Sequence, residues 1–362
     1  MKLQELLNTL DQVAPLRFAE SWDNVGLLAG DASRDVKRAM LTIDFTAEVA
    51  QETYATGCDL VIAYHPVIFA PIKQIVAPSL VFEAISRGVS IYCPHTALDV
   101  ADGGTNDVLG DVLGLTNRRA LRQAAATPWH YKLIVYVPVE QGESVCAAMF
   151  QAGAGWIGNY SHCSFRSEGT GTFLGHEGSH PSVGEPGKLE HAKEQRVETI
   201  VPAGKLSTVV AAMIKAHPYE EPAFDIIQLI TPPDGKGMGR IGSVPKISRL
   251  ELLEQIKLKL GVQNALVAGP LDGEVATAAC CAGACGSLIN DAMAQGAQLL
   301  LTGEVRHHDA LKAAAAGMTV VCALHSNSER LTLRRLAQRL SESAPQVEFL
   351  VSKADHDPFA IV

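Results

Sequence analysis

Short apolar runs alternate with helical stretches along the first third of the chain. Four leucines near the start recur at helical spacing and predict an N-terminal helix: Leu3, Leu6, Leu7 and Leu10. Strands are then expected at 39–45, 60–64 and 89–93, and helices at 47–56 and 80–87. Apolar strands separated by helices are typical of a largely parallel sheet covered on both faces. The pattern therefore predicts an α/β domain.

A different order of elements begins near residue 128. Strand, helix, strand, strand, helix and strand are expected in turn up to about residue 230, with a Gly- and Pro-rich loop at 175–188. This is the β-α-β-β-α-β order of a ferredoxin-like α+β unit. The α/β pattern returns from about residue 241, after a hinge expected at Pro232, Pro233 and 235–239.

The simplest architecture is one α/β domain that is split in sequence by the inserted ferredoxin-like domain. Its first half is expected at 1–127, the insert at 128–234 and its second half at 235–362. With 362 residues, of which 47% are hydrophobic, the chain has enough material for two domains with real cores.

Charge and composition exclude two classes of partner. The net charge is −9 and no basic run occurs, which argues against a nucleic-acid-binding surface. No apolar stretch reaches the roughly 18 residues of a membrane span, and the polar start does not resemble a signal peptide. The eight cysteines lack CxxC spacing, so we expect reduced, mostly buried thiols in a cytoplasmic protein.

The two halves of the α/β pattern repeat each other. The segment 57–63 matches 296–302, and 88–93 matches 317–322. A histidine follows each second segment and a carboxylate lies four residues beyond it: His95 with Asp99, and His325 with Glu329. Ligands gather at the carboxyl ends of parallel strands, so the repeat predicts that these polar pairs face one another.

The same strand ends carry further polar residues. Tyr64, His65 and Pro66 end one predicted strand, and Glu304, His307 and His308 follow the matching strand. Imidazole and carboxylate together suit a divalent ion such as Zn, Mn, Fe, Co or Ni, with one or two ions per chain. The alternative interpretation is a hydrogen-bonded polar cluster at a domain seam.

Six separated motifs give the chain a resemblance to a known family. They are 21–27 (SWDNVGL), 64–69 (YHPVIF), 95–99 (HTALD), 103–107 (GGTND), Thr302–Gly303–Glu304 with His307–His308, and 325–329 (HSNSE). In this respect the sequence resembles the Nif-three-like family, the GTP cyclohydrolase 1 type 2 homologues. The insert resembles that of the longer members at 152–160 and 217–222.

The resemblance implies a dinuclear metal centre and a toroidal homohexamer. It places the metal ligands at His65, Asp99, His325 and Glu329, with Glu329 bridging the two ions. Many members have a second histidine where this chain has Tyr64. We therefore expect one firm site (His65, Asp99, Glu329) and a weaker one (His325, Glu329), where Tyr64 stands aside, bonds to water or binds poorly.

Two hypotheses for function follow. The first is a metal-dependent hydrolase of a nucleotide or another phosphate-bearing small molecule, which includes a GTP cyclohydrolase-like activity. His307 or His308 would carry protons there, and Glu304 would orient one of them. The second is a non-catalytic metal-binding scaffold or small-molecule sensor.

Two further motifs have alternative interpretations. The segment 283–287 (GACGS) is either a turn or a phosphate cradle at a helix N-terminus. The segment 217–222 (HPYEEP) is either a helix stop with solvated acids or a place where Tyr219 and Glu220 form a subunit contact or a ligand groove.

Overall fold

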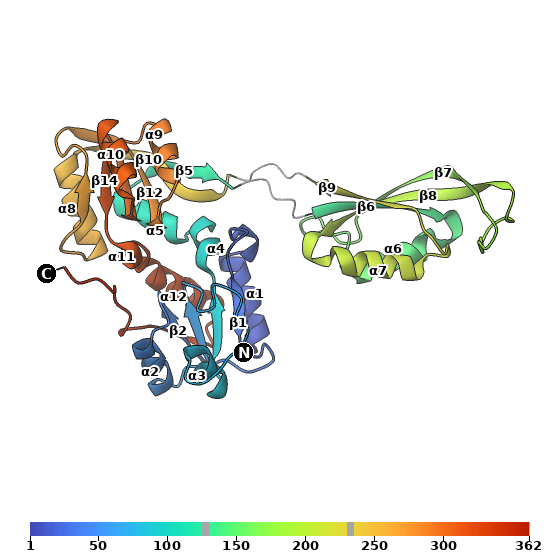
Figure 1. The fold of residues 1–362 in the computed structure, drawn as a ribbon, viewed down its shortest axis with the longest axis horizontal. Coiled ribbons are helices and arrows are strands. Elements are labelled where there is room, and N and C mark those ends of the chain that lie inside the picture. The colour runs from blue at the N-terminus through green and yellow to red at the C-terminus, as the bar shows by residue number, and fades with distance from the viewer. Residues whose placement is uncertain (125–129, 230–234, 362) are drawn as a thin grey trace. The chain divides into compact units, whose positions relative to one another are not determined.

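The computed structural model describes residues 1–124, 130–229 and 235–361, and the chain divides into two compact units (Figure 1). Unit 1 comprises Met1–Ala124 with Asp234–Val362, and unit 2 comprises Ala125–Pro233. The expected domain boundaries, after residues 127 and 234, lie outside the described residues. The prediction of a mixed α/β protein with several sheets is confirmed. None of the described helices is long and apolar enough to cross a membrane.

The first sheet of unit 1 has five strands. In sheet order they are β1 (Gly26–Ala29), β4 (Ser90–Cys93), β3 (Leu60–Ala63), β2 (Arg38–Thr42) and β15 (Glu348–Val351). All neighbours are parallel except β1 with β4. Successive side chains of a strand point to opposite faces. Both faces of β3 are therefore buried, which explains its unbroken apolar run.

Four helices cover this sheet. They are α1 (Leu3–Val13), α2 (Ala47–Ala55), α3 (Leu80–Ser86) and α12 (Leu331–Ser343). Leu60 and Ile62 of β3 share one core with residues of α1 and α12. Val61 and Ala63 share the other with residues of α2 and α3. Of the four leucines that predicted the N-terminal helix, Leu3, Leu6 and Leu10 are buried, and Leu7 is partly buried against the same core.

The second sheet of unit 1 has six strands. In order they are β11 (Leu266–Ala268), β14 (Thr319–Cys322), β13 (Leu299–Glu304), β12 (Glu274–Ala284), β10 (Gly237–Ser248) and β5 (Thr116–Gln123). Only β12, β13 and β14 are parallel to one another. The order β11-β14-β13-β12 repeats β1-β4-β3-β2 of the first sheet. The repeat seen in the sequence is therefore a repeat of topology.

Two layers of helices pack on the second sheet. Residues of α5 (Thr105–Leu113) and α8 (Arg249–Leu260) share one core with it. Residues of α9 (Leu288–Ala294) and α10 (His307–Ala315) share the other. The segment 283–287 leads from the end of β12 into α9 as expected: Gly283 and Ala284 lie within β12, and Ser287 is the N-cap of α9.

The halves of unit 1 exchange strands, which the sequence analysis did not foresee. The C-terminal strand β15 pairs with β2 in the first sheet, and β5 pairs with β10 in the second. The helical stretch 325–343 is divided into two helices, α11 (His325–Glu329) and α12. Short 3-10 turns occur at Leu16–Phe18, Val139–Gln141 and Ala203–Lys205.

The hinge expected at 235–239 is wrong in its second part. Gly237, Met238 and Gly239 belong to β10, which pairs with β5. A Cβ at Gly237 would overlap the Arg122 carbonyl oxygen, and Gly239 has a φ of +65°. These glycines are present because two backbones approach closely and one position is left-handed, not because the segment is a linker.

Unit 2 is a four-stranded antiparallel sheet with two helices. The sheet order is β7 (Ser164–Leu174), β8 (Leu189–Pro202), β6 (His130–Pro138) and β9 (Phe224–Leu229). The helices α6 (Gly142–Gln151) and α7 (Leu206–Ala216) share one core with the sheet. The third element of the expected order, a strand, is β7.

We expect unit 2 to lose stability in mild acid because of His217. This buried side chain has both ring nitrogens engaged: Nε2 lies 2.9 Å from the Tyr136 carbonyl oxygen, and Nδ1 accepts the Tyr219 N–H at 3.1 Å. Burial lowers the pKa of His217 below 6.5, although the Tyr136 carbonyl opposes this effect. The stability that the neutral His217 side chain contributes to unit 2 is therefore present above pH 6.5 and is lost as the pH falls through its folded-state pKa.

The measurement is hydrogen exchange of the β6 and β8 amides at pH 7.5 and pH 5 in wild type and His217→Gln. At pH 7.5 the free energy of opening of these amides should be about 1 kcal/mol higher in wild type than in His217→Gln. This difference should be smaller at pH 5. His176→Gln, at an exposed site in the same unit, is the matched control. A gap that is equal at both pH values would contradict this account.

Candidate metal centre

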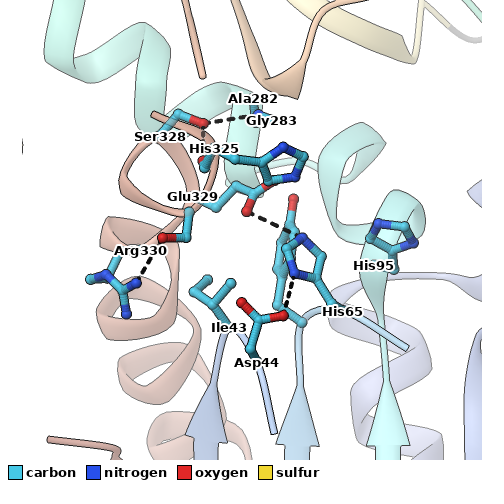
Figure 2. A network of polar contacts seen from close by, with 12 residues as sticks. Ile43, Asp44, His65, His95, Ala282, Gly283, His325, Ser328, Glu329 and Arg330 are labelled. Atoms are coloured by element: carbon cyan, nitrogen blue, oxygen red, sulfur yellow. Dashed lines mark hydrogen bonds and ion pairs between the residues drawn. The ribbon is translucent and has the colours of Figure 1, made fainter. Parts of the chain in front are cut away.

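Two strand ends of unit 1 bring His65, His325 and Glu329 together (Figure 2). His65 follows β3, whereas His325 and Glu329 lie one helical turn apart on α11, which follows β14. The ring centroids of the two histidines are 5.2 Å apart. One ligand atom from each of the three residues lies within 4.8 Å of the others. Of the two repeated histidine–acid pairs, only His325 and Glu329 belong to this group, and its third member, His65, follows a strand of the other half.

Glu329 stands between the two imidazoles. Its Oε2 is 3.3 Å from His65 Nε2, and its Oε1 is 3.3 Å from His325 Nε2. The side chain is buried, and neither His65 Nε2 nor Glu329 Oε2 has a hydrogen-bond partner among the described residues. Buried polar atoms are nearly always satisfied, and these two face each other at 3.3 Å without hydrogen-bond geometry, so they are available to a ligand.

An outer carboxylate orients each imidazole. Asp44 Oδ1 is 2.9 Å from His65 Nδ1, and Glu304 Oε1 is 3.0 Å from His325 Nδ1. An Nδ1–H that donates to a carboxylate leaves the Nε2 lone pair directed at the centre, as in carboxylate–histidine–metal triads. The sequence-based hypothesis paired Glu304 with His307 or His308, whereas its partner in the structure is His325.

Sequence reasoning did not single out Asp44. It lies just beyond the carboxyl end of β2, next to β3 in the same sheet. A carboxylate after a parallel strand is the signal that was used for the other site residues. That signal was available here too, but Asp44 lacks the histidine that drew attention to the repeat.

The surrounding carboxylates favour charged imidazoles when no metal is bound. Burial lowers the pKa of His65, but the hydrogen bond to Asp44 and the nearby Glu329 carboxylate outweigh it and raise the pKa to about 10. The bond to Glu329 is the main reason that the pKa of His325 rises to about 9. Burial raises the pKa of Glu329, yet the two histidines hold it below its ordinary value. A metal ion would therefore displace protons from both rings.

Asp99, the fourth predicted ligand, is engaged by Tyr64. The Tyr64 hydroxyl donates a hydrogen bond to Asp99 Oδ1, and both side chains are buried. Burial raises the pKa of Asp99 to about 6 and the pKa of Tyr64 well above its ordinary value of 10. Asp99 is not among the three residues whose ligand atoms cluster within 4.8 Å. Tyr64 thus remains a neutral phenol that holds a carboxylate.

His95 lies beside the group but is held from outside it. Its Nδ1 is 2.8 Å from Asp23 Oδ1, and its ring centroid is 5.5 Å from that of His65. Burial raises the pKa of Asp23, but hydrogen bonds from His95 and Thr96 keep it below its usual range. Asp23 therefore orients His95 at the start of α4 (His95–Val100).

The proposed proton carriers are exposed at the start of α10. The rings of His307 and His308 lie 5.4 Å apart and have no hydrogen bond to His65, His325 or Glu329 in the described structure. Of the three residues given catalytic roles, only Glu304 contacts the cluster.

The backbone around Gly283 leaves space for the cluster. The Gly283 N–H donates to Ser328 Oγ at 2.9 Å, and that hydroxyl donates to the His325 carbonyl at 2.7 Å (Figure 2). A Cβ at Gly283 would lie 2.6 Å from Glu329 Oε1 and 3.1 Å from His325 Nε2. Only glycine allows β12 to pass this close to both ligands.

We expect Gly283→Ala to weaken metal binding without removing a ligand. The new methyl group must displace Glu329 or His325, and overpacking of this kind corresponds to a loss of affinity of about tenfold or more. Gly286→Ala is the matched control, because Gly286 has a similar positive φ with nothing within 4 Å of an added Cβ. Zn²⁺ titration by calorimetry should show weaker binding by Gly283→Ala than by Gly286→Ala. Equal losses of affinity in the two variants would show that the positive φ, which both positions share, is the cause and not the overlap with Glu329 and His325.

Comparison with known proteins now identifies the family. The family model described as Duf34/NIF3 (NGG1p interacting factor 3) matches residues 1–358. The chain belongs to the DUF34/NIF3 family. It is 35% identical to a GTP cyclohydrolase 1 type 2 homolog from Halalkalibacterium halodurans and 36% identical to one from Bacillus subtilis. Each match covers 99% of this chain and 98% of the relative.

Solved structures give the same result. A Bacillus cereus protein related to NIF3 is 36% identical with a TM-score of 0.71, and a Staphylococcus aureus protein is 27% identical with a TM-score of 0.74. Both matches cover 100% of this chain and 99% of the other. The resemblance drawn from six motifs is confirmed over the whole DUF34/NIF3 chain.

Proposed function

We propose that this DUF34/NIF3 protein binds one or two divalent transition-metal ions (Zn, Fe, Mn, Co or Ni) through His65, His325 and Glu329. The observation that carries the proposal is the convergence of two outward-anchored imidazoles on one buried carboxylate, with His65 Nε2 and Glu329 Oε2 lacking partners. Two nitrogen ligands and a carboxylate suit these metals. Asp99 would join the set only after it is released by Tyr64.

We further propose that the bound metal serves the hydrolysis of a nucleotide or another phosphate-bearing small molecule. A bound divalent ion supplies Lewis acidity and activates water for such a reaction. Glu304 and Asp44 would hold the imidazoles in position, and the exposed His307 and His308 are candidates to move protons near the rim. GTP is the first substrate to test, because curated relatives are named GTP cyclohydrolase 1 type 2 homologs.

The experiment has two stages. Metal content per chain is first measured by elemental mass spectrometry on untagged protein purified without added metal. Wild type and Glu304→Gln, which keeps the three inner ligands, are then assayed against GTP and a panel of phosphorylated compounds. Turnover that requires bound metal and falls in Glu304→Gln supports the hydrolase; at least one metal ion per chain without turnover of any compound refutes it.

One observation favours a non-catalytic alternative. The Tyr64 hydroxyl donates a hydrogen bond to Asp99, so the described ligand group has three protein ligands rather than the four predicted. A metal-binding scaffold or small-molecule sensor needs only one such site. Bound metal without turnover is the result that this alternative predicts.

We propose that the protein assembles as a homohexamer and that unit 2 is an inserted ferredoxin-like domain. The element order β6-α6-β7-β8-α7-β9 and the sheet order β7-β8-β6-β9 support the second statement. Light scattering after size-exclusion chromatography tests the first, because a hexamer has six times the 38.5 kDa mass of the chain.

A further inference from the structure

Unit 2 contains a cavity of about 610 Å³ that the metal chemistry does not use. It lies between the β7–β8 hairpin and the segment that follows α7, with part of the 175–188 loop as a wall. Its volume is within the range of small-molecule sites, roughly 300–1,000 Å³. The HPYEEP segment, which the sequence left open as a subunit contact or a ligand groove, supplies Tyr219, Glu220 and Glu221 to it.

A buried carboxylate reaches this cavity from β8. Glu194 is only 9% exposed, and the Tyr219 hydroxyl donates to its Oε1 at 2.9 Å. That is its only hydrogen bond in the described structure, and no described Lys or Arg pairs with it; Arg196, two residues along the strand, pairs with Glu198 instead. A carboxylate buried this deeply normally has a cation or several donors. The second oxygen, Oε2, accepts no hydrogen bond from the described residues and lies beside Gly171, which lines the cavity.

The shape of the cavity keeps that carboxylate in place. Gly171 of β7 lies against Glu194, so a Cβ at Gly171 would overlap the carboxylate. On the far wall, the His180 N–H donates to Glu220 Oε1 at 2.9 Å, which ties the loop to the HPYEEP segment. Hydrogen bonds within unit 2 thus tie the 175–188 loop and Glu194 to the HPYEEP segment.

The remaining lining determines the class of ligand. Four carboxylates and one guanidinium line the cavity: Glu168, Glu194, Glu220, Glu221 and Arg196. The rings of Phe173 and Tyr219 lie 6.3 Å apart at 59° to each other, and Tyr136 adds a third aromatic side chain. The excess of negative charge disfavours anions, whereas carboxylates beside aromatic rings favour a cation on an apolar body.

We propose that this cavity binds a small organic cation, an amidinium, guanidinium or primary ammonium group on a flat or short apolar body. The charged group donates to Glu194 Oε2, and the apolar body packs on Phe173 and Tyr219. The proposal does not depend on the metal centre, because all lining residues belong to unit 2.

The test uses two matched pairs of probes on the full-length protein. Benzamidine and benzylammonium are cations, and benzamide and benzyl alcohol are neutral molecules of similar shape. Isothermal titration calorimetry should show that the cations bind at least about tenfold more tightly than the neutral probes, the difference expected for a desolvated charge-assisted bond. Cations that do not bind, or neutral probes that bind equally well, overturn the proposal.

Variants locate the binding. Glu194→Gln should lower benzamidine affinity at least about tenfold. Glu143→Gln, an exposed site in unit 2 that does not line the cavity, and Glu329→Gln, at the metal centre, should leave it unchanged. If Glu194→Gln does not fold by circular dichroism, Gly171→Ala serves instead, because its methyl group displaces the carboxylate. Wild-type affinity in the folded variant would refute the site.

Discussion

Replacing Glu329 with Gln is expected to remove metal binding almost completely. Both carboxylate oxygens lie 3.3 Å from a histidine Nε2, so one residue serves both halves of the centre. An amide has no negative charge and offers a single acceptor oxygen, so neither half of the group keeps its anionic ligand. We expect an affinity loss of about 100-fold or more, in the upper range for a change in a metal's ligand environment.

The measurement is metal content together with Zn²⁺ titration of the metal-free protein. Glu342→Gln, an exposed carboxylate near the end of α12, is the matched control and should behave like wild type. Retention of wild-type metal content in folded Glu329→Gln would show that the cluster is only a polar network, the alternative interpretation of the sequence.

The pH dependence of stability tests the electrostatics of the His65–Glu329–His325 group without metal. His65 and His325 have pKa values raised to about 10 and about 9 in the metal-free protein. A raised histidine pKa contributes stability that is complete below the unfolded value near 6.5 and is lost as the pH rises through the folded value. Metal-free wild type should therefore become easier to unfold between pH 6.5 and pH 10, and Glu329→Gln should show a shallower decline.

The parts of this site that the sequence predicted are those that follow strand ends. The repeat of a strand followed by a histidine and an acid drew attention to His325 and Glu329, and His65 was noted because it ends a predicted strand at the same edge. The family resemblance then placed metal ligands at all three. The local pattern of buried and exposed residues determines where each strand stops. It therefore also places the residues that come directly after a strand.

What the sequence did not predict depends on pairings between distant segments. The exchange of β5 and β15 joins residues of opposite halves, and nothing in a run such as 116–123 shows which sheet it joins. Gly283 lay in a segment that was interpreted as a turn or phosphate cradle, because its closeness to Glu329 is visible only in three dimensions. Likewise, the hydrogen bond between Tyr64 and Asp99 could not be predicted, because it depends on where the two side chains lie in three dimensions.

Replacing Tyr64 with His is the second change expected to have a large effect, and it should strengthen metal binding. The raised pKa of Tyr64 keeps its side chain a neutral phenol, which is a poor ligand. The phenol hydroxyl also donates a hydrogen bond to Asp99. A histidine would supply a nitrogen ligand and remove the phenol from Asp99. We expect the second equivalent of metal to bind at least about tenfold more tightly than in wild type.

Tyr64→Phe separates the two causes. It removes the hydroxyl that bonds to Asp99 without adding a ligand, so the second equivalent of metal should not bind more tightly than in wild type. Because the Tyr64 hydrogen bond lowers the pKa of Asp99, its loss should raise that pKa further above about 6 and leave the carboxyl group protonated near neutral pH. The loss of this buried bond should also cost about 1–3 kcal/mol of stability. If Tyr64→His shows the stoichiometry and affinity of wild type by metal analysis and calorimetry, then Tyr64 does not limit the second site.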